Sequence, residues 1–254
     1  FNSGVHLNTS AALVPNELRM SPQGSAPTPY LSIPIGGRRL ASFAGYPYTP
    51  GRIARLDTRT GVVLGDYRCV PDQLESSPSR AVVDSQGNTW VTSQYASSGT
   101  VSVTKIGIIV GGTRYFKISE GVYVQDPIGE YVKDPQYTTG VDRDGDGYIR
   151  TSRGLGYSLA WNATAGRDLD SSINPGNDGI VEEADDELIL VFKRFPGTTG
   201  ESDNFYSRGI SIDPEDNVWF GRHENFTPKL TKVDSQTGVD LVNFTGPRAG
   251  YTQL

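Results

Sequence analysis

Internal repetition is the feature that most constrains what this chain can fold into. Three segments align without gaps, namely Val83–Val91, Val141–Ile149 and Ile212–Phe220. Each starts with a β-branched residue and Asp, continues through polar residues and ends on an aromatic residue followed by an apolar one. Gly, Asn and Asp in the middle tolerate a positive φ, whereas the residues after them favour a pleated strand. Each segment therefore predicts a strand, a tight polar turn and a second strand.

A second hairpin also recurs, because Arg52–Tyr67 aligns without gaps with Lys229–Phe244. Asp, Thr and Gly occupy matching places in the two turns. Two hairpins make one four-stranded antiparallel unit, and with the longer inserts set aside the units recur every ~45 residues, within the range of propeller repeats. The sequence thus predicts an all-β chain, specifically a β-propeller of four-stranded antiparallel blades with at least four blades.

The spacing of the repeats sets the expected boundaries. The propeller is predicted over residues 29–254, and residues 1–28 are predicted to be an N-terminal extension or a closing strand. Blades are expected near residues 29–68, 77–117, 138–196 and 205–244. The step to the last blade is long because it contains an acidic stretch, 163–187, which we interpret as an insertion.

These repeats resemble a known group of propellers. The pattern Asp-x-x-Gly-Asn-x-Trp-Val at residues 84–91, with the later Lys-Ile or Lys-Val-Asp and Thr-Gly, is similar to streptogramin-lyase-like and NHL-type repeats. Residues 77–90 and 142–152 also resemble large secreted bacterial propeller proteins. The resemblance covers residues 29–250 and implies the fold. It leaves the activity open, since propellers serve binding, scaffolding and catalysis alike.

One segment carries a pattern typical of calcium loops. Carboxylates occupy positions 1, 3 and 5, Gly147 occupies position 6, and the carbonyl of Tyr148 occupies position 7. The three carboxylates are Asp142, Asp144 and Asp146. Hard oxygen ligands select Ca²⁺, and no His or Cys lies nearby. The match ends at position 12, where Arg153 replaces a bidentate Glu, so the alternative is an ordinary acidic turn equivalent to residues 84–89.

A second, degenerate calcium loop is predicted inside the acidic stretch. Its expected ligands are the side chains of Asn174 and Asp178, the carbonyl of Ile180 and the side chain of Asp185 at position 12.

A catalytic set is much less evident. His6 and His223 are the only histidines, and His223-Glu224 follows the last repeat, where a base and an acid would suit a lyase. However, the lyase-type repeats carry Glu three residues after the Trp, and this chain has Ser93 and Arg222 there. The resemblance therefore does not extend to catalysis, and we expect no catalytic residues.

Composition narrows the setting and the partners. A net charge of −6 argues against nucleic acid, and no apolar run reaches the ~18 residues of a membrane span. The single Cys69 excludes an intrachain disulfide, and the chain begins with Phe1, as a mature secreted chain or an internal segment would. Glycosylation-type triplets start at Asn8, Asn162, Asn225 and Asn243. Together with the calcium loops, these features predict a secreted, extracellular or cell-surface protein.

Two functions follow from these residues. The first is a secreted, calcium-stabilised propeller that serves as a binding, adhesion or extracellular assembly module, with a protein or glycan surface partner or further copies of itself. The second is a lyase or lactone-hydrolase-like enzyme with a metal in the central channel. The position of the metal separates them, because a module would hold it in a peripheral loop and an enzyme on the propeller axis.

Overall fold

The computed structural model describes residues 30–35, 51–57, 60–74, 76–96, 100–163, 179–195, 206–224 and 227–245. These residues form eighteen strands in antiparallel sheets and contain no helix, so the all-β prediction is confirmed. It follows that the described residues hold no helix long and apolar enough to cross a membrane. They form no closed barrel or propeller ring.

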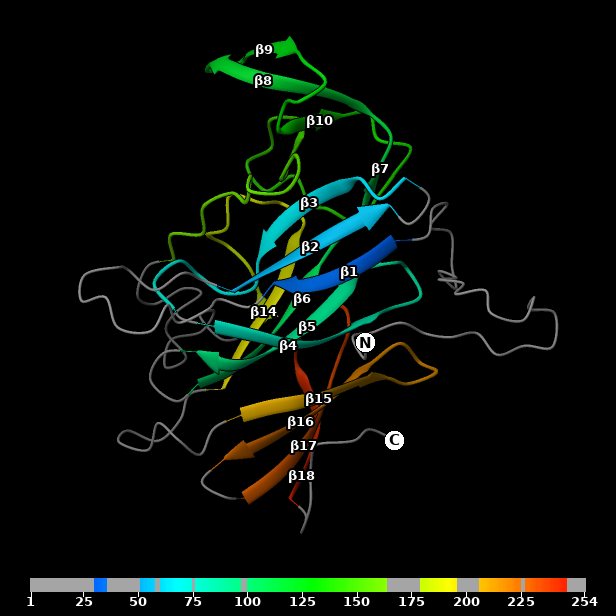
Figure 1. Cartoon of the computed structure of the whole chain (residues 1–254), viewed down its shortest axis with the longest axis vertical. Helices are drawn as coiled ribbons and strands as arrows, with labels where there is room; N and C mark the ends of the chain where they lie inside the picture. Colours follow the sequence, from blue (N-terminus) through cyan, green and yellow to red (C-terminus); the bar gives the residue numbers. More distant parts are fainter. Residues whose placement is uncertain are drawn as a thin grey trace, which may run out of the picture.

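Three sheets follow one another along the chain and are stacked in the same order (Figure 1). The first sheet contains β1 (Tyr30–Ile35), β2 (Arg52–Asp57) and β3 (Val63–Arg68). The second contains β4 (Ser76–Val83), β5 (Thr89–Ala96), β6 (Thr100–Ile106), β14 (Ile189–Phe195) and β13 (Gly179–Ile180). The third is a meander of β15 (Tyr206–Ile212), β16 (Val218–Glu224), β17 (Thr227–Val233) and β18 (Asp240–Thr245).

The second sheet departs from the predicted blade over 77–117. Its strand next to β6 is β14, which is separated from β6 by residues 107–188; of the described residues in that stretch, only β13 belongs to the second sheet. We call residues 107–188 the excursion. It contains β7 (Ile109–Val110), β8 (Thr113–Ser119), β9 (Val122–Gln125), β10 (Tyr131–Lys133), β11 (Tyr137–Thr138) and β12 (Ile149–Arg150).

The excursion also replaces the blade expected over 138–196. The segment Val141–Ile149 does not form a hairpin, since only its last residue lies in a strand and the backbone N–H of Val141 donates to the carbonyl of Glu187 (3.2 Å). By contrast, the residues near 205–244 form a four-stranded antiparallel sheet in the order β15, β16, β17, β18. The first sheet pairs three strands within 29–68.

Two apolar clusters hold the three sheets together. One lies between the first and second sheets and extends into the excursion; it includes Ile53, Val91, Ile106, Trp161 and Phe192, all buried. The other lies between the second and third sheets. It is built from Val82, Trp90, Val101, Val103, Val191, Phe195, Ile210, Val218, Phe220 and Val233. Each sheet therefore buries a face against the next, as antiparallel sheets with alternating apolar residues must.

The hairpin that recurs at Arg52–Tyr67 and Lys229–Phe244 has the same turn in both copies. In the first sheet, the N–H of Asp57 donates to the carbonyl of Val62 (2.9 Å) and that of Gly61 to the carbonyl of Asp57 (2.8 Å). In the third sheet, Asp234, Val239 and Gly238 make the same two bonds, each at 2.9 Å. Gly61 and Gly238 both have φ of 71°, a conformation that favours glycine.

The Asp–Trp repeat is conserved in three dimensions between the second and third sheets. The indole N–H of Trp90 donates to Asp84 Oδ2 (3.2 Å), and that of Trp219 donates to Asp213 Oδ2 (2.9 Å). A lysine on the neighbouring strand lies over each indole, 5.4 Å away for Lys105 and 5.5 Å for Lys232. The sequence repeat is thus a repeated Asp–Trp–Lys cluster.

Lys105 also joins two sheets. Its buried ammonium donates to the carbonyl of Ser235 in the third sheet (2.7 Å) and lies 3.7 Å from Asp84. Burial lowers the pKa of Lys105, and the carboxylates of Asp84, Asp216 and Asp234 raise it. Lys232 lies at the matching place and forms a salt bridge of 2.6 Å with the partly exposed Asp213.

Replacing the two lysines separates their roles. We expect Lys105→Met to lower the free energy of unfolding by about 3 kcal/mol, because it leaves the buried Asp84 without its cation. Lys232→Met, at the matching partly exposed pair, should cost less than about 1 kcal/mol. Urea denaturation measures both, and equal losses would contradict the assignment of Lys105 as a link between sheets.

Candidate metal centre

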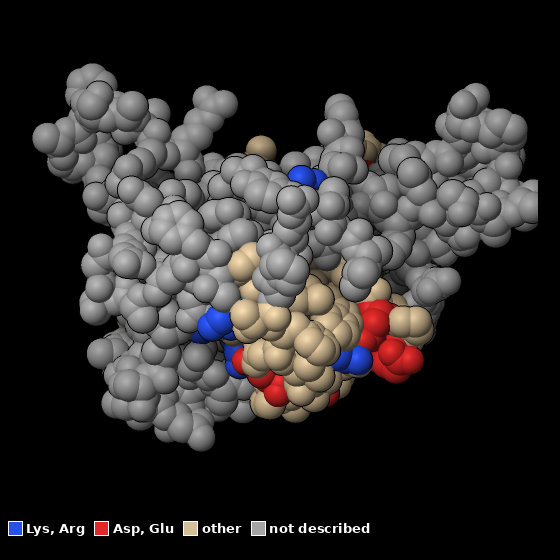
Figure 2. All heavy atoms as spheres, turned by 90° about the horizontal axis from the view of Figure 1, so that it is seen from below, with Lys and Arg blue, Asp and Glu red and all other residues tan. Residues whose placement is uncertain are grey.

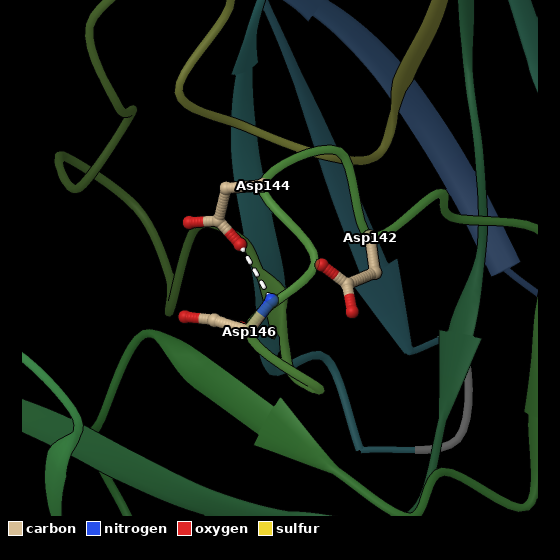
Figure 3. A group of neighbouring side chains, drawn as sticks. All are labelled: Asp142, Asp144 and Asp146. Carbon is tan, nitrogen blue, oxygen red and sulfur yellow. Dashed lines mark hydrogen bonds between the residues drawn. The ribbon is translucent and has the colours of Figure 1, made fainter.

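Three carboxylates converge in one turn of the excursion, residues 142–148, which we call the acidic loop. A carboxylate oxygen from each of Asp142, Asp144 and Asp146 lies within 4.8 Å of the others. Figure 3 shows the three side chains around the loop. The side chain of Asp144 is exposed and that of Asp146 is partly buried. The three residues that their spacing in the sequence singled out therefore lie together in the structure.

Backbone amides shape the loop around these acids. Asp142 accepts bonds from the N–H groups of Gly145 (2.7 Å) and Gly147 (2.9 Å), one on each carboxylate oxygen. Asp144 Oδ1 accepts from the N–H of Asp146 (3.1 Å), which is the dashed line in Figure 3. Gly145 and Gly147 have φ of 74° and 84°, so glycine at these positions permits the tight curve.

A buried glutamate fixes the loop at both ends. Glu187 Oε1 accepts from the N–H of Arg143 (2.6 Å), and Oε2 accepts from the N–H of Arg150 (2.7 Å). The Arg143 guanidinium donates to the carbonyls of Ile189 (2.9 Å), Asp186 (2.8 Å) and Ala184. The loop is thus clamped to the segment that leads into β14.

Tyrosines cover one side of the loop. The hydroxyl of Tyr123 in β9 donates to Asp146 Oδ2, and the ring of Tyr148 stacks on that of Tyr123 with centroids 4.0 Å apart. Desolvation and the bond to Asp146 raise the pKa of Tyr123 to about 12, so the phenol stays protonated and can donate. Tyr131 meets Tyr123 edge to face, with centroids 5.3 Å apart.

The donor set suits a hard divalent cation. Three carboxylates this close repel one another by ~1–4 kcal/mol per pair at 4 Å in a solvent-like to intermediate dielectric, and a cation would relieve that repulsion. Oxygen-only donors favour Ca²⁺ over zinc or copper.

The residue at position 12 of the loop pattern, Arg153, points to other partners. Its guanidinium lies 3.9 Å from the ring centroid of Tyr157 and donates to the carbonyl of Ile128 (3.2 Å). Among the described residues, no fourth carboxylate joins the cluster.

The second predicted loop is only partly described. Asn174 and Asp178 lie outside the described residues. The backbone of Ile180 pairs with Val191 across β13 and β14. Asp185 forms an ion pair with Arg150 (3.2 Å), so its carboxylate already has a cationic partner.

The remaining sequence candidates are dispersed. Asn162 is exposed, and Asn243 is exposed on β18, where its amide donates to Asp240 (3.1 Å) and accepts from Thr231 (2.6 Å). Asn8 and Asn225 lie outside the described residues. The backbone of His223 pairs with Tyr206 and Pro228 within the third sheet.

Sequence reasoning missed the residues that hold the loop. Arg143 sits between two aspartates and gave no signal of a structural role, and Tyr123 comes from a separate strand. Glu187 stood out only as one of many acids near the end of the acidic stretch. Their roles depend on the return of the chain to β14, which no local pattern reveals.

Comparison with known proteins gives no relative from which a site could be transferred. No protein-family model, no curated protein and no solved structure matches this chain. The case for a function therefore rests on the chain's own residues.

A buried aspartate beside the loop makes stability depend on pH. Asp186 accepts from Thr151 Oγ1 (3.0 Å) and from the N–H groups of Ser152 (3.0 Å) and Leu188 (3.1 Å). Burial raises its pKa from 3.8 to about 6, even though these hydrogen bonds lower it. The folded state therefore holds this proton more tightly than the unfolded state.

We expect this group to make the free energy of unfolding fall by about 2–3 kcal/mol as the pH rises from about 4 to about 6. Asp186→Asn removes the ionisable group and should flatten the profile by that amount. Glu120→Gln, at an exposed carboxylate, is the control. Urea denaturation across this pH range measures the effect, and an unchanged slope in Asp186→Asn would contradict the assignment.

Proposed function

We propose that this chain is a calcium-stabilised β-propeller-type module that works outside the cell in binding, adhesion or assembly. The observation that carries the proposal is the acidic loop, in which three carboxylates at positions 1, 3 and 5 meet within 4.8 Å. With only three described carboxylates, the loop suits the weak calcium sites of extracellular modules, whose dissociation constants are ~10⁻⁴–10⁻³ M. A calcium site with such a weak affinity supports a location outside the cell.

The blade assignment rests on the stacked sheets. The third sheet is a four-stranded antiparallel meander, and it packs on the second sheet through an apolar cluster. The Asp–Trp–Lys cluster repeats between these two sheets at matching register positions. Consecutive meanders stacked through equivalent faces are the arrangement of propeller blades. The resemblance to streptogramin-lyase-like and NHL-type repeats supports the same proposal.

The place of the acidic loop favours a module over an enzyme. The loop belongs to the excursion between β6 and β14, and it is anchored by Glu187 just before β14 and by the bond from Arg143 to Ile189, so its contacts reach only one of the three stacked sheets. A catalytic metal on a propeller axis would need ligands from several blades. We therefore expect no lactone-hydrolase or lyase turnover that depends on His223; loss of such turnover in a folded His223→Ala variant would favour the enzyme.

Calcium titration tests the module directly. A hundredfold excess of Ca²⁺ over Kd should stabilise the folded chain by about 2.7 kcal/mol, or about 5–10 °C in Tm for a chain of this size. Asp144→Ala should lose most of this shift. Asp144→Asn should lose less, because the amide keeps one ligand oxygen while losing the charge.

The matched control is Glu215→Ala, which removes an exposed acid from a turn of the third sheet and should leave the calcium shift intact. Differential scanning calorimetry with Ca²⁺, with Mg²⁺ and with chelator at equal ionic strength measures all variants. Identical melting curves in calcium and chelator would leave the loop as an ordinary acidic turn.

A further inference from the structure

The outermost strand of the sheet in the excursion has an open edge. The strands of this sheet lie in the order β12, β10, β8, β9, so β9 pairs with β8 alone among the described residues. The N–H of Asp126 donates to the carbonyl of Arg114 on β8 (2.9 Å). Inward and outward groups alternate along an antiparallel strand, so the backbone groups of Val124 also face β8, and those of Tyr123 and Gln125 face outward. The outer edge of β9 therefore presents two N–H groups and two carbonyls.

A related segment of the chain is paired on both sides. Residues 122–127 read Val-Tyr-Val-Gln-Asp-Pro, and residues 130–135 read Glu-Tyr-Val-Lys-Asp-Pro. The second of these segments forms β10, which pairs with both β8 and β12. Its Val132 is 1% exposed, whereas Val124, at the matching position of β9, is 48% exposed. The strand β9 thus has the β-branched and aromatic composition of an inner strand, but it lies at an edge.

The other described edges carry residues that discourage pairing with another chain, namely charged residues or proline. Every other described edge strand longer than two residues has one in its sequence: Pro34 in β1, Asp66 in β3, Pro78 in β4, Arg208 in β15 and Asp240 in β18. Seen from below, charged side chains lie at the margins of the described surface (Figure 2). By contrast, β9 reads Val-Tyr-Val-Gln and has neither a charge nor a proline.

Contacts with the acidic loop hold β9 in place. The hydroxyl of Tyr123 donates to Asp146, and its ring stacks on that of Tyr148. The ammonium of Lys117 on β8 lies 5.7 Å from the centroid of the Tyr123 ring. Strands β8 and β9 lie at one end of the molecule, beyond the stacked sheets (Figure 1). The edge is therefore ordered in advance, which lowers the entropy cost of pairing.

We propose that two copies of the chain associate through the outer edges of β9, so that their two four-stranded sheets become continuous. The inference rests on the assembly role proposed above and names a second copy as the partner. With a two-fold axis at Val124, Tyr123 of one copy lies opposite Gln125 of the other, and the outward N–H and carbonyl of each residue find partners. This pairing places valine against valine and no charge against a like charge.

Only this register uses all the outward groups. An axis at Tyr123 would place Gln125 opposite Gly121, whose φ of 69° takes it out of the extended conformation. An axis at Gln125 would place Tyr123 opposite Pro127, which has no N–H. The strand β9 is therefore complementary to itself in one register, which favours a second copy over an unrelated strand.

Cysteine crosslinking tests this register. The native Cys69 is buried, so a cysteine added on β9 supplies the accessible thiol. In Val124→Cys the two added residues face each other with Cα atoms about 4.5 Å apart, within the range of a disulfide. Val122→Cys is the matched control, because Val122 is 49% exposed but lies roughly 13 Å from its equivalent in the second copy. We expect a mild oxidant to link Val124→Cys into dimers about tenfold faster than Val122→Cys, and equal rates would overturn the proposal.

Sedimentation velocity of the chain without added cysteines measures the association itself. Gln125→Pro removes an outward N–H and leaves the bonds to β8 intact, as proline on an edge strand does, so it should weaken the dimer about tenfold. Val62→Gln, at an exposed residue of a turn in the first sheet, should leave the dimer unchanged. Circular dichroism shows whether both variants are folded. A chain that stays monomeric up to about 1 mM, or a dimer that a folded Gln125→Pro variant retains, would overturn the proposal.

The calcium response and the dimer can fail separately. Asp144→Ala keeps the bond between Tyr123 and Asp146, so it should lose the calcium shift and keep the dimer. A dimer without any calcium shift in the native chain would contradict the calcium-stabilised module and support the pairing of β9. A calcium shift without a dimer would contradict the pairing of β9 alone.

Discussion

The stack depends on a cation buried between two sheets. Lys105 lies on the second sheet, but its ammonium donates to the carbonyl of Ser235 in the third and faces Asp84. Burying this charge is costly, and only a partner at each of these positions offsets the cost. The position of that carbonyl in the turn between β17 and β18 therefore favours one placement of the third sheet on the second. Arg55 makes the corresponding link from the first sheet, donating to the carbonyl of Ile106 (3.3 Å) and the hydroxyl of Thr89 (3.1 Å) in the second.

The same topology explains why the acidic loop lies where it does. Because β14 pairs with β6, both ends of the excursion meet at one strand pair, and residues just before β14 are held against the loop. Glu187 and Arg143 make those contacts through backbone groups on both sides. The carboxylates are thus brought together by a rigid frame before any ion arrives, and their mutual repulsion is the part of the folding free energy that an ion would remove.

The strand class, the third sheet and the three aspartates could be predicted because each depends on neighbours in sequence. Val141–Ile149 shows where that logic ends. Asp84 accepts from the N–H groups two and four residues further on, whereas Asp142 accepts from those three and five residues further on, so the same sequence pattern gives two different turns. The aromatic residue differs too: Trp90 donates its indole N–H back to Asp84, whereas Tyr148 stacks on Tyr123. The contact with Tyr123 comes from a distant strand, and no local pattern predicts it.

The acidic loop and the third sheet are connected through one core. The loop is clamped to the segment entering β14, β14 pairs with β6, and β6 carries Lys105. Both apolar clusters include residues of β14, namely Phe192 in one and Val191 in the other. A chain whose clusters share a strand tends to unfold cooperatively, so an ion bound in the loop would stabilise all three sheets together.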